Sequence, residues 1–449
     1  MIFQPTAAAL AAALAGFVAA SPVKPPTQDN NNKPASSFSV VQIPNHNFRS
    51  HGPAQLAKTL SKYGVKLPDG LARTVSQIDA PLRPRHRQHF GSAPTTPKQY
   101  DVEYLTPVQI GTPPQTLNLE FDSTTAALWV MSTDLPPHMV DGQALYDARS
   151  SSTSQIVSDV SWSTSYGGQS SASGKVYRDI VTVGGVTVED QVVEVATKVS
   201  TQFTLDGKKD GLFGLAFSSM NAAQLERELT WFDNAVESTL DEPVWTADLK
   251  YHQAGSYDFG FIDPEKYTGS IAYVDVNATA GFWMTNLTGY GIGSTNRNTS
   301  YASRNSSHAS STFIQAPFQA VVDTSTSLAM LPHRIVGAYY RSVPGARVDS
   351  TQGGYVFPCS APLPDFILGV GNPGSVGVEL TIPGQYVNYA PAVKAAGADM
   401  CFGGIQSAEG MDFPVLGDIV LKAAFVVFDA GTGKGNPRLG WATKKVSVF

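Results

Sequence analysis

Two aspartates follow strand-like runs in closely similar local sequences. Asp122 lies in LNLEFDSTTAALWV, where apolar residues alternate before the carboxylate and an apolar run resumes after it, and Asp323 lies in FQAVVDTSTSLAMLP. Hydroxyl residues follow both aspartates: Ser123, Thr124 and Thr125 after the first, and Thr324, Ser325 and Thr326 after the second. Two carboxylates within hydrogen-bonding distance share a proton, because like charges that close cannot both ionise easily. One can then act as a base on water and the other as an acid on a carbonyl, so the matched sequences predict a paired-aspartate site.

The elements that would position such a pair are mostly strands. The chain has 449 residues, which is too long for one ordinary core and favours two lobes. Its 40 glycines and 30 prolines separate many short runs of Val, Ile, Thr and Tyr, a pattern typical of turn-rich β structure. The best helical periodicity is the short NAAQLERELTWF, residues 221–232. We therefore expect an all-β fold with few short helices.

The N-terminal stretch MIFQPTAAALAAALAGFVAASP has the apolar core and small-residue end of a secretion signal. We assign residues 1–20 to that signal and expect a secreted, extracellular protein, with a vacuolar location as the alternative. The segment lacks a basic start, so a buried helix or a membrane anchor is the competing interpretation. No other segment is long and apolar enough to span a bilayer, so no membrane association is expected once the signal is removed.

Charge divides the rest of the chain into a basic leader and an acidic body. Residues 21–94 carry ten Lys and Arg against three Asp and Glu, a net charge of +7, whereas residues 95–449 carry 21 against 34, a net charge of −13. This split suggests an intramolecular electrostatic clamp between a propeptide and the body. A basic segment that only stays soluble is the alternative. Nucleic acid is a poor partner for so acidic a body.

The cysteines and the sequons fit a secreted chain. Cys359 and Cys401 are the only two cysteines and are expected to form a disulfide, with two free thiols as the alternative. With so few cysteines and no histidine cluster, we expect no metal site and no cofactor. Four Asn-x-Ser/Thr sequons predict a glycosylated surface flank, of which only one to three would be occupied: Asn277, Asn286, Asn298 and Asn305.

The chain resembles the fungal pepsin-type aspartic proteases of the aspergillopepsin and penicillopepsin group, from about Phe38 to Trp441. Segments on both sides of each aspartate carry the resemblance: EYLTPVQIGTPPQTLNLEFD, SYGGQSSASGKVYRDIVTVGG, KDGLFGLAF, YVFPCSAPLPDF, MCFGGIQS and FPVLGDIVLKAAFVVFD. The leader's LAKTLSKYGVKLP is similar to the family's prosegment.

The resemblance implies a bilobal fold with a central cleft, an N-terminal lobe over 95–262 and a C-terminal lobe over 263–449. It implies a monomer that acts on protein or peptide substrates and is first bound by its own propeptide. The resemblance also assigns roles to residues outside the aspartate loops. It places a flap tip at Tyr166, Gly167 and Gly168, and it implies that Trp129 hydrogen-bonds the flap tyrosine. It further implies that Gly214 and Gly417 brace the loops and that Lys62 and Tyr63 of the leader lie over the two aspartates.

The sequence departs from the family where a glycine should follow each Asp-Ser or Asp-Thr. Thr124 and Ser325 stand at these positions. If the backbone there has a positive φ, a side chain would be strained by about 1–3 kcal/mol, and the β-branched Thr124 would be the worse case. Alternatively, the added hydroxyls stabilise the ionised carboxylates. The flap also departs, since Gly168 replaces an acidic residue and Gln169 a glycine.

Three functions remain open on these grounds. The first is an aspartic endopeptidase that hydrolyses peptide bonds at acid pH through a water activated between Asp122 and Asp323. The second is a peptide-binding pseudoprotease with impaired catalysis. The third is an aspartic-protease scaffold that uses the same two carboxylates for acid/base chemistry on a small molecule.

Overall fold

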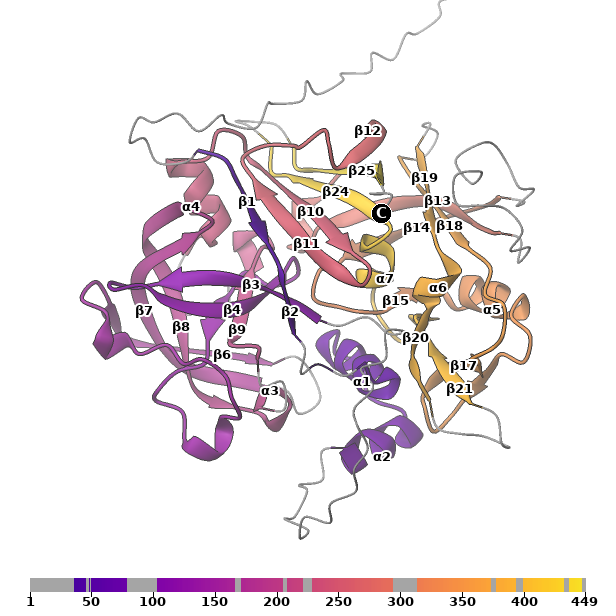
Figure 1. The fold of residues 1–449 in the computed structure, drawn as a ribbon, viewed down its shortest axis with the longest axis horizontal. Coiled ribbons are helices and arrows are strands. Elements are labelled where there is room, and N and C mark those ends of the chain that lie inside the picture. The colour runs from indigo at the N-terminus through magenta and orange to yellow at the C-terminus, as the bar shows by residue number, and fades with distance from the viewer. Residues whose placement is uncertain are drawn as a thin grey trace, which may run out of the picture.

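A computed structural model of the chain shows a protein built mainly of β-sheet (Figure 1). The residues described are 36–45, 48, 50–78, 103–165, 171–204, 208–220, 228–293, 313–372, 377–392, 399–431 and 436–445. The signal segment 1–20, the flap tip and the sequons at Asn298 and Asn305 lie outside these ranges.

A six-stranded antiparallel sheet joins the two halves of the molecule. Its middle is apolar: Trp245 stacks on Phe428 with ring centroids 3.6 Å apart. In spatial order its strands are β1 (Phe38–Val41), β11 (Gln253–Phe259), β10 (Val244–Lys250), β24 (Ala424–Asp429), β25 (Arg438–Lys444) and β12 (Tyr267–Asp275). The leader strand β1 pairs with β11, so part of the leader is built into this sheet.

The first lobe contains an eight-stranded sheet, on the left of Figure 1. Its long β6–β7 hairpin lies at one edge of the sheet. In spatial order the strands are β2 (Ile43–Asn45), β3 (Glu103–Ile110), β4 (Gln115–Asp122), β9 (Gly211–Gly214), β5 (Leu128–Val130), β8 (Val186–Val199), β7 (Ser171–Val183) and β6 (Gln155–Ser165).

The second lobe contains a seven-stranded and a four-stranded sheet. The larger one consists of β19 (Val378–Ile382), β18 (Phe366–Val370), β13 (Met284–Ile292), β14 (Ile314–Val322), β23 (Val415–Leu416), β15 (Ala329–Leu331) and β22 (Ile405–Ser407). The smaller one consists of β16 (Arg347–Asp349), β17 (Gly354–Pro358), β21 (Met400–Gly403) and β20 (Asn388–Pro391). The Cys359–Cys401 disulfide ties β21 to the end of β17, which confirms the predicted pairing.

The same three-strand arrangement holds the start of both aspartate loops. In the first lobe β4 runs parallel to β9, which is antiparallel to β5, and in the second lobe β14, β23 and β15 repeat this pattern. A glycine follows or ends the middle strand each time. A Cβ on Gly214 would lie 2.4 Å from the carbonyl carbon of Ala126, and one on Gly417 would lie 2.2 Å from the carbonyl oxygen of Thr326. Only glycine lets the middle strand lie this close beneath each loop.

The helices are short. In chain order they are α1 (Gly52–Lys62), α2 (Asp69–Ile78), α3 (Thr201–Thr204), α4 (Trp231–Ser238), α5 (His333–Arg341), α6 (Gly384–Val387) and α7 (Asp418–Leu421). The best helical stretch of the sequence, 221–232, reaches into α4 only at its end, and its first residues lie outside the described ranges. The predicted all-β class with few short helices is confirmed.

The leader helices lie between the two lobes, at the lower centre of Figure 1. Their apolar faces are buried: Leu56, Leu60 and Leu71 are at most 6% exposed and belong to one cluster with Met330 and Phe402 of the second lobe. Burying an aliphatic side chain of this size contributes about 1.5–3 kcal/mol. Apolar packing and strand pairing therefore hold much of the leader. Of the leader residues described, Lys58 and Lys62 form ion pairs with the body.

No helix within the described ranges is long and apolar enough to cross a membrane. Across the same ranges, no group of three or more His, Cys, Asp and Glu side chains is arranged to hold a metal ion.

Candidate active site

Asp122 and Asp323 occupy equivalent places in the two repeated motifs. Asp122 is the last residue of β4 and Asp323 directly follows β14, and their exposures are 1% and 0%. Backbone hydrogen bonds join each aspartate to the middle strand of its motif or to the residue that follows that strand. Leu215 N–H donates to the Asp122 carbonyl at 2.8 Å, and Asp323 N–H donates to the Leu416 carbonyl at 3.1 Å. Both carboxylates are thus carried on rigid strand ends in the protein interior.

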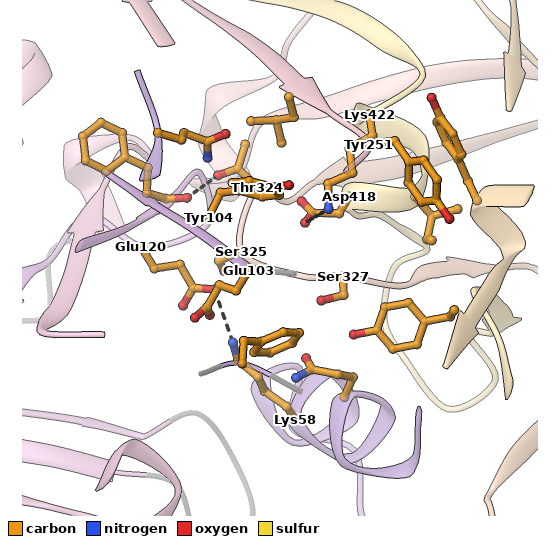
Figure 2. Close-up of a pocket in the computed structure, with 18 of the residues that line it drawn as sticks. Lys58, Glu103, Tyr104, Glu120, Tyr251, Thr324, Ser325, Ser327, Asp418 and Lys422 are labelled. Atoms are coloured by element: carbon orange, nitrogen blue, oxygen red, sulfur yellow. Dashed lines mark hydrogen bonds and ion pairs between the residues drawn. The ribbon is translucent and has the colours of Figure 1, made fainter. Parts of the chain in front are cut away.

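The residues directly after the two aspartates lock the loops together. Ser123 N–H donates to Thr324 Oγ1 at 3.0 Å, and Thr324 N–H donates to Ser123 Oγ at 3.1 Å. Each hydroxyl then donates across to the other lobe: Ser123 to the Val322 carbonyl at 2.7 Å and Thr324 to the Phe121 carbonyl at 2.6 Å. Figure 2 shows Thr324 and its bond to that carbonyl. The sequence analysis placed these residues in the loops but did not predict the hydrogen bonds that join the two loops. The sequence feature that could have indicated them is the hydroxyl residue directly after each aspartate.

The residues that replace the family's glycines are not strained. Within the described ranges the non-glycine residues with positive φ are Asp159 and His252, so neither Thr124 nor Ser325 has the left-handed backbone that would penalise a side chain. The condition for the expected backbone strain, a positive φ, is therefore not met at either position. Thr124 donates to Asp122 Oδ1 from its backbone N–H at 2.8 Å and from its hydroxyl at 2.7 Å. Ser325 donates to Asp323 Oδ1 in the same way, at 3.0 and 3.1 Å.

The next hydroxyl distinguishes the two loops. Thr326 Oγ1 donates to Asp323 Oδ2 at 2.6 Å. Its counterpart Thr125 instead accepts a hydrogen bond from Ala127 N–H at 3.3 Å. Residues of its own loop thus donate hydrogen bonds to both carboxylate oxygens of Asp323. The hydrogen bonds described from the loop to Asp122 both go to Oδ1.

Lys62, the last residue of α1, extends its ammonium group between the two carboxylates. Lys62 Nζ lies 3.1–3.2 Å from the oxygens of Asp122 and 3.0–3.1 Å from those of Asp323. Four oxygens this close to one atom place the two carboxylates within about 6 Å of each other. Tyr63, which caps α1, donates its hydroxyl to Asp323 Oδ2 at 2.8 Å.

Electrostatics favour the charged forms in this cluster. Burial opposes ionisation of Asp323, but Lys62 and the Thr326 hydroxyl outweigh it and leave the pKa of Asp323 below its usual value. Burial likewise opposes the charge on Lys62, yet the two aspartates raise the pKa of Lys62 above its usual value. Burial and the neighbouring Asp323 charge raise the pKa of Tyr63 well above its usual value. Tyr63 therefore stays neutral and serves as a donor.

A second charged cluster lies beside the dyad. Lys209 bridges Glu103 at 2.9 Å and Glu120 at 3.1 Å, and Lys58 of α1 reaches Glu120 at 3.4 Å, as Figure 2 shows for the Lys58 pair. Burial raises the pKa of Glu120, but the charges of Lys209 and Lys58 outweigh this and lower it. The sequence analysis did not identify this network, whose members are far apart in the chain.

The structure describes the predicted flap contacts and glycosylation sites only in part. Trp129 is 1% exposed and stacks against Trp162 of β6 with ring centroids 6.0 Å apart. Its predicted bond to the flap is not tested, because Tyr166, Gly167 and Gly168 lie outside the described residues.

Two of the predicted glycosylation sites lie within the described ranges. Asn277 is exposed, whereas Asn286 is half-buried and donates from Nδ2 to Asn372 at 3.1 Å.

This fold and this site define the class of two-lobed β proteins with one aspartate loop in each lobe. Residues 103–444 match the family described as eukaryotic aspartyl protease, and the chain belongs to that family. It is 44% identical to endothiapepsin of Cryphonectria parasitica, over 97% of this chain and 98% of that protein. It is 42% identical to aspergillopepsin-1 of Aspergillus fumigatus, over 91% and 93%. It is 43% identical to penicillopepsin-2 of Penicillium janthinellum, over 87% of both chains.

Proposed function

We propose that this protein is a secreted aspartic endopeptidase that cleaves peptide bonds at acid pH, with Asp122 and Asp323 as its catalytic pair. The observation that carries this proposal is the position of Lys62 Nζ, which lies within 3.2 Å of all four carboxylate oxygens. A small hydrogen-bonding group between two buried carboxylates is the arrangement that a nucleophilic water requires.

In the reaction, one carboxylate is ionised and removes a proton from the water as the water oxygen attacks the peptide carbonyl. The other carboxylate gives its proton to the carbonyl oxygen, which forms a tetrahedral intermediate. The carboxylate that took the water proton then passes it to the amide nitrogen, and the other carboxylate takes back a hydroxyl proton as the C–N bond breaks and the amine leaves. The bonds between Ser123 and Thr324 hold the carboxylates at a fixed spacing, so little geometric rearrangement is needed at that step.

We propose that residues 21–94 are a propeptide that inhibits the enzyme until acid releases it, and that residues 1–20 direct secretion. Because the pKa of Asp323 is lowered by Lys62, the clamp is present above the ordinary aspartate pKa of about 3.9 and is lost as the pH falls through the folded value. The pKa of Lys62 is raised, so its charge persists throughout acidification. Maturation would end near residues 85–95, by self-cleavage or by a protease that recognises basic sites.

We further propose large apolar residues on both sides of the cut and poor acceptance of lysine. Gly168 provides no carboxylate at the flap, and Glu120 is already paired with Lys209 within the body. An extended peptide would be held by its backbone, with its side chains in alternate pockets.

We also expect the mature enzyme to be a monomer and the exposed Asn277 to carry a glycan.

The deciding experiment measures cleavage of denatured protein between pH 2 and pH 7 by acid-treated wild type and by Asp122→Asn. We expect cleavage below about pH 5 that the variant lacks. A wild type that binds a transition-state-like peptide inhibitor without cleaving would be a pseudoprotease. Turnover of a small molecule without proteolysis would instead indicate the recruited scaffold.

A peptide library tests specificity separately, and strong cleavage after lysine would contradict that part of the proposal.

A further inference from the structure

The ammonium group of Lys62 marks a defined point between the carboxylates, and Ser325 also reaches that point. Lys62 Nζ donates to Ser325 Oγ at 2.6 Å, a shorter distance than to any of the four carboxylate oxygens. A water molecule is close in size to an ammonium group and can donate two hydrogen bonds where the ammonium group donates three. The same point is therefore where a water would lie once the leader has left.

The hydroxyl of Ser325 is oriented for contact with that water. Ser325 Oγ donates to Asp323 Oδ1 at 3.1 Å, and the backbone N–H of the same residue donates to that oxygen at 3.0 Å. Because the hydroxyl proton is directed to Asp323, a lone pair of Oγ faces the central point and accepts from Lys62. Ser325 is 8% exposed with the leader in place.

Water also has room beside Ser325. The hydroxyl borders a cavity of about 50 Å³ whose other polar wall groups include Thr324, Ser327 and Glu120, all drawn in Figure 2. A polar cavity needs roughly 10–15 Å³ to hold one water. Leader residues, among them Gln55 and Lys58, form part of the wall, so in the precursor Ser325 borders both the dyad and a space that can hold water.

We propose that Ser325 is a further catalytic residue, whose hydroxyl accepts one hydrogen bond from the nucleophilic water while the ionised aspartate accepts the other. This proposal rests on the proposed endopeptidase function. As the oxygen–carbon bond forms, one water proton passes to the ionised aspartate and the other aspartate protonates the carbonyl oxygen. Ser325 neither gains nor loses a proton; it fixes the orientation of the water so that an oxygen lone pair points toward the substrate carbonyl.

Thr124, the matching residue of the other loop, has a different role. Its hydroxyl donates to Asp122 Oδ1 at 2.7 Å, and in the described part of the chain no hydrogen bond joins it to Lys62 Nζ. Thr124 is therefore a positioning residue that acts through Asp122. It also shows that a threonine fits at this place in a loop.

The test compares mature wild type with Ser325→Ala and Ser325→Thr, using two matched peptide inhibitors. One inhibitor carries a central hydroxyl that replaces the nucleophilic water, and the other has a methylene there. We expect Ser325→Ala to bind the hydroxyl inhibitor about tenfold more weakly and the methylene inhibitor within about twofold of wild type. The kcat should fall about tenfold with little change in KM, and Ser325→Thr should restore both values to within about threefold.

Equal weakening of both inhibitors would show a structural role only and would overturn the proposal, as would an alanine variant with unchanged kcat and unchanged inhibitor binding. If Ser325→Ala does not fold, Ser325→Gly removes the same hydroxyl at a backbone position that glycine can occupy. A wild type that never cleaves peptides refutes the proposed function. The inhibitor comparison still decides in that case whether Ser325 touches the group at the water position.

Discussion

The two aspartate loops share one backbone design but differ in the hydrogen bonds their side chains make. Both carboxylates receive a backbone N–H and a hydroxyl on Oδ1, from Thr124 in one loop and from Ser325 in the other. Asp323 has an additional donor on Oδ2, because Thr326 turns toward it, whereas Thr125 turns toward its own loop. The difference arises at the third residue after each aspartate.

This asymmetry assigns different roles to the two carboxylates. Hydrogen bonds to an ionised carboxylate favour the ionised form, and Asp323 has three such loop donors against two for Asp122. We therefore expect Asp323 to be the anion that activates water, with the shared proton on Asp122. Two similar sequences can thus provide a base and an acid, because side-chain orientation differs between otherwise matching loops.

The largest expected effect comes from removing either carboxylate. Asp122→Asn and Asp323→Asn should each lower kcat/KM for an apolar peptide at least about a thousandfold, since an amide can neither hold the shared proton nor activate water. Steady-state assays at pH 3.5 measure this, with inhibitor binding as a control for folding. If one variant keeps more than about a tenth of wild-type activity, the pair does not share the reaction.

The next effect separates a residue that bonds to both carboxylates from one that donates to the Asp323 carboxylate. Lys62→Met removes the buried cation from both carboxylates and should weaken leader binding about a hundredfold or more, whereas Tyr63→Phe, which loses one bond to Asp323, should weaken it about tenfold. Inhibitor access to the uncleaved precursor at pH 6 measures both.

Wild-type release should occur as the pH falls below about 4, because the lowered pKa of Asp323 confines the clamp to higher pH. Lys62→Met should lose this dependence. Precursor that stays equally protected at pH 3 and pH 7 would contradict the clamp.

A smaller effect tests the residues that replace the family's glycines. Thr124→Gly with Ser325→Gly should lower kcat more than about tenfold, beyond the effect of losing the Ser325 hydroxyl alone, and leave the fold intact, because each change removes a hydroxyl donor but keeps the backbone N–H. Strain at these positions would produce the opposite result, an increase in rate. Kinetics and thermal unfolding of the double variant and of each single variant distinguish the two accounts.

The smallest effect examines the asymmetry itself. Thr326→Val removes the donor from Asp323 Oδ2, which raises the pKa of that carboxyl, so the acid limb of the kcat/KM profile should move up by about 0.5–1 pH unit. Thr125→Val should leave this limb in place, since Thr125 Oγ1 accepts from Ala127 N–H and makes no described bond to Asp122. Equal shifts in both variants would show that the loops are electrostatically equivalent.

Much of the architecture could be predicted from local sequence. Alternating apolar residues before Asp122 and Asp323 indicate strands, and the glycines and prolines between short β runs indicate an all-β fold. The Cys359–Cys401 pair followed from having only two cysteines in a chain expected to be secreted. These inferences succeed because strand pattern, turn chemistry and cysteine pairing depend on residue type and neighbouring residues.

Contacts between distant segments were decided only by the tertiary structure. Lys62 and Asp323 are separated by 261 positions, and their meeting depends on how α1 packs between the lobes. The backbone conformation at Thr124 could not be derived from residue type, so only the structure shows that the positive φ on which the strain depended is not present. Sequence identified the hydroxyls after each aspartate, but which oxygen or ammonium each one reaches depends on side-chain rotation within the packed loops. That rotation is why Ser325 contacts the point between the carboxylates and Thr124 does not.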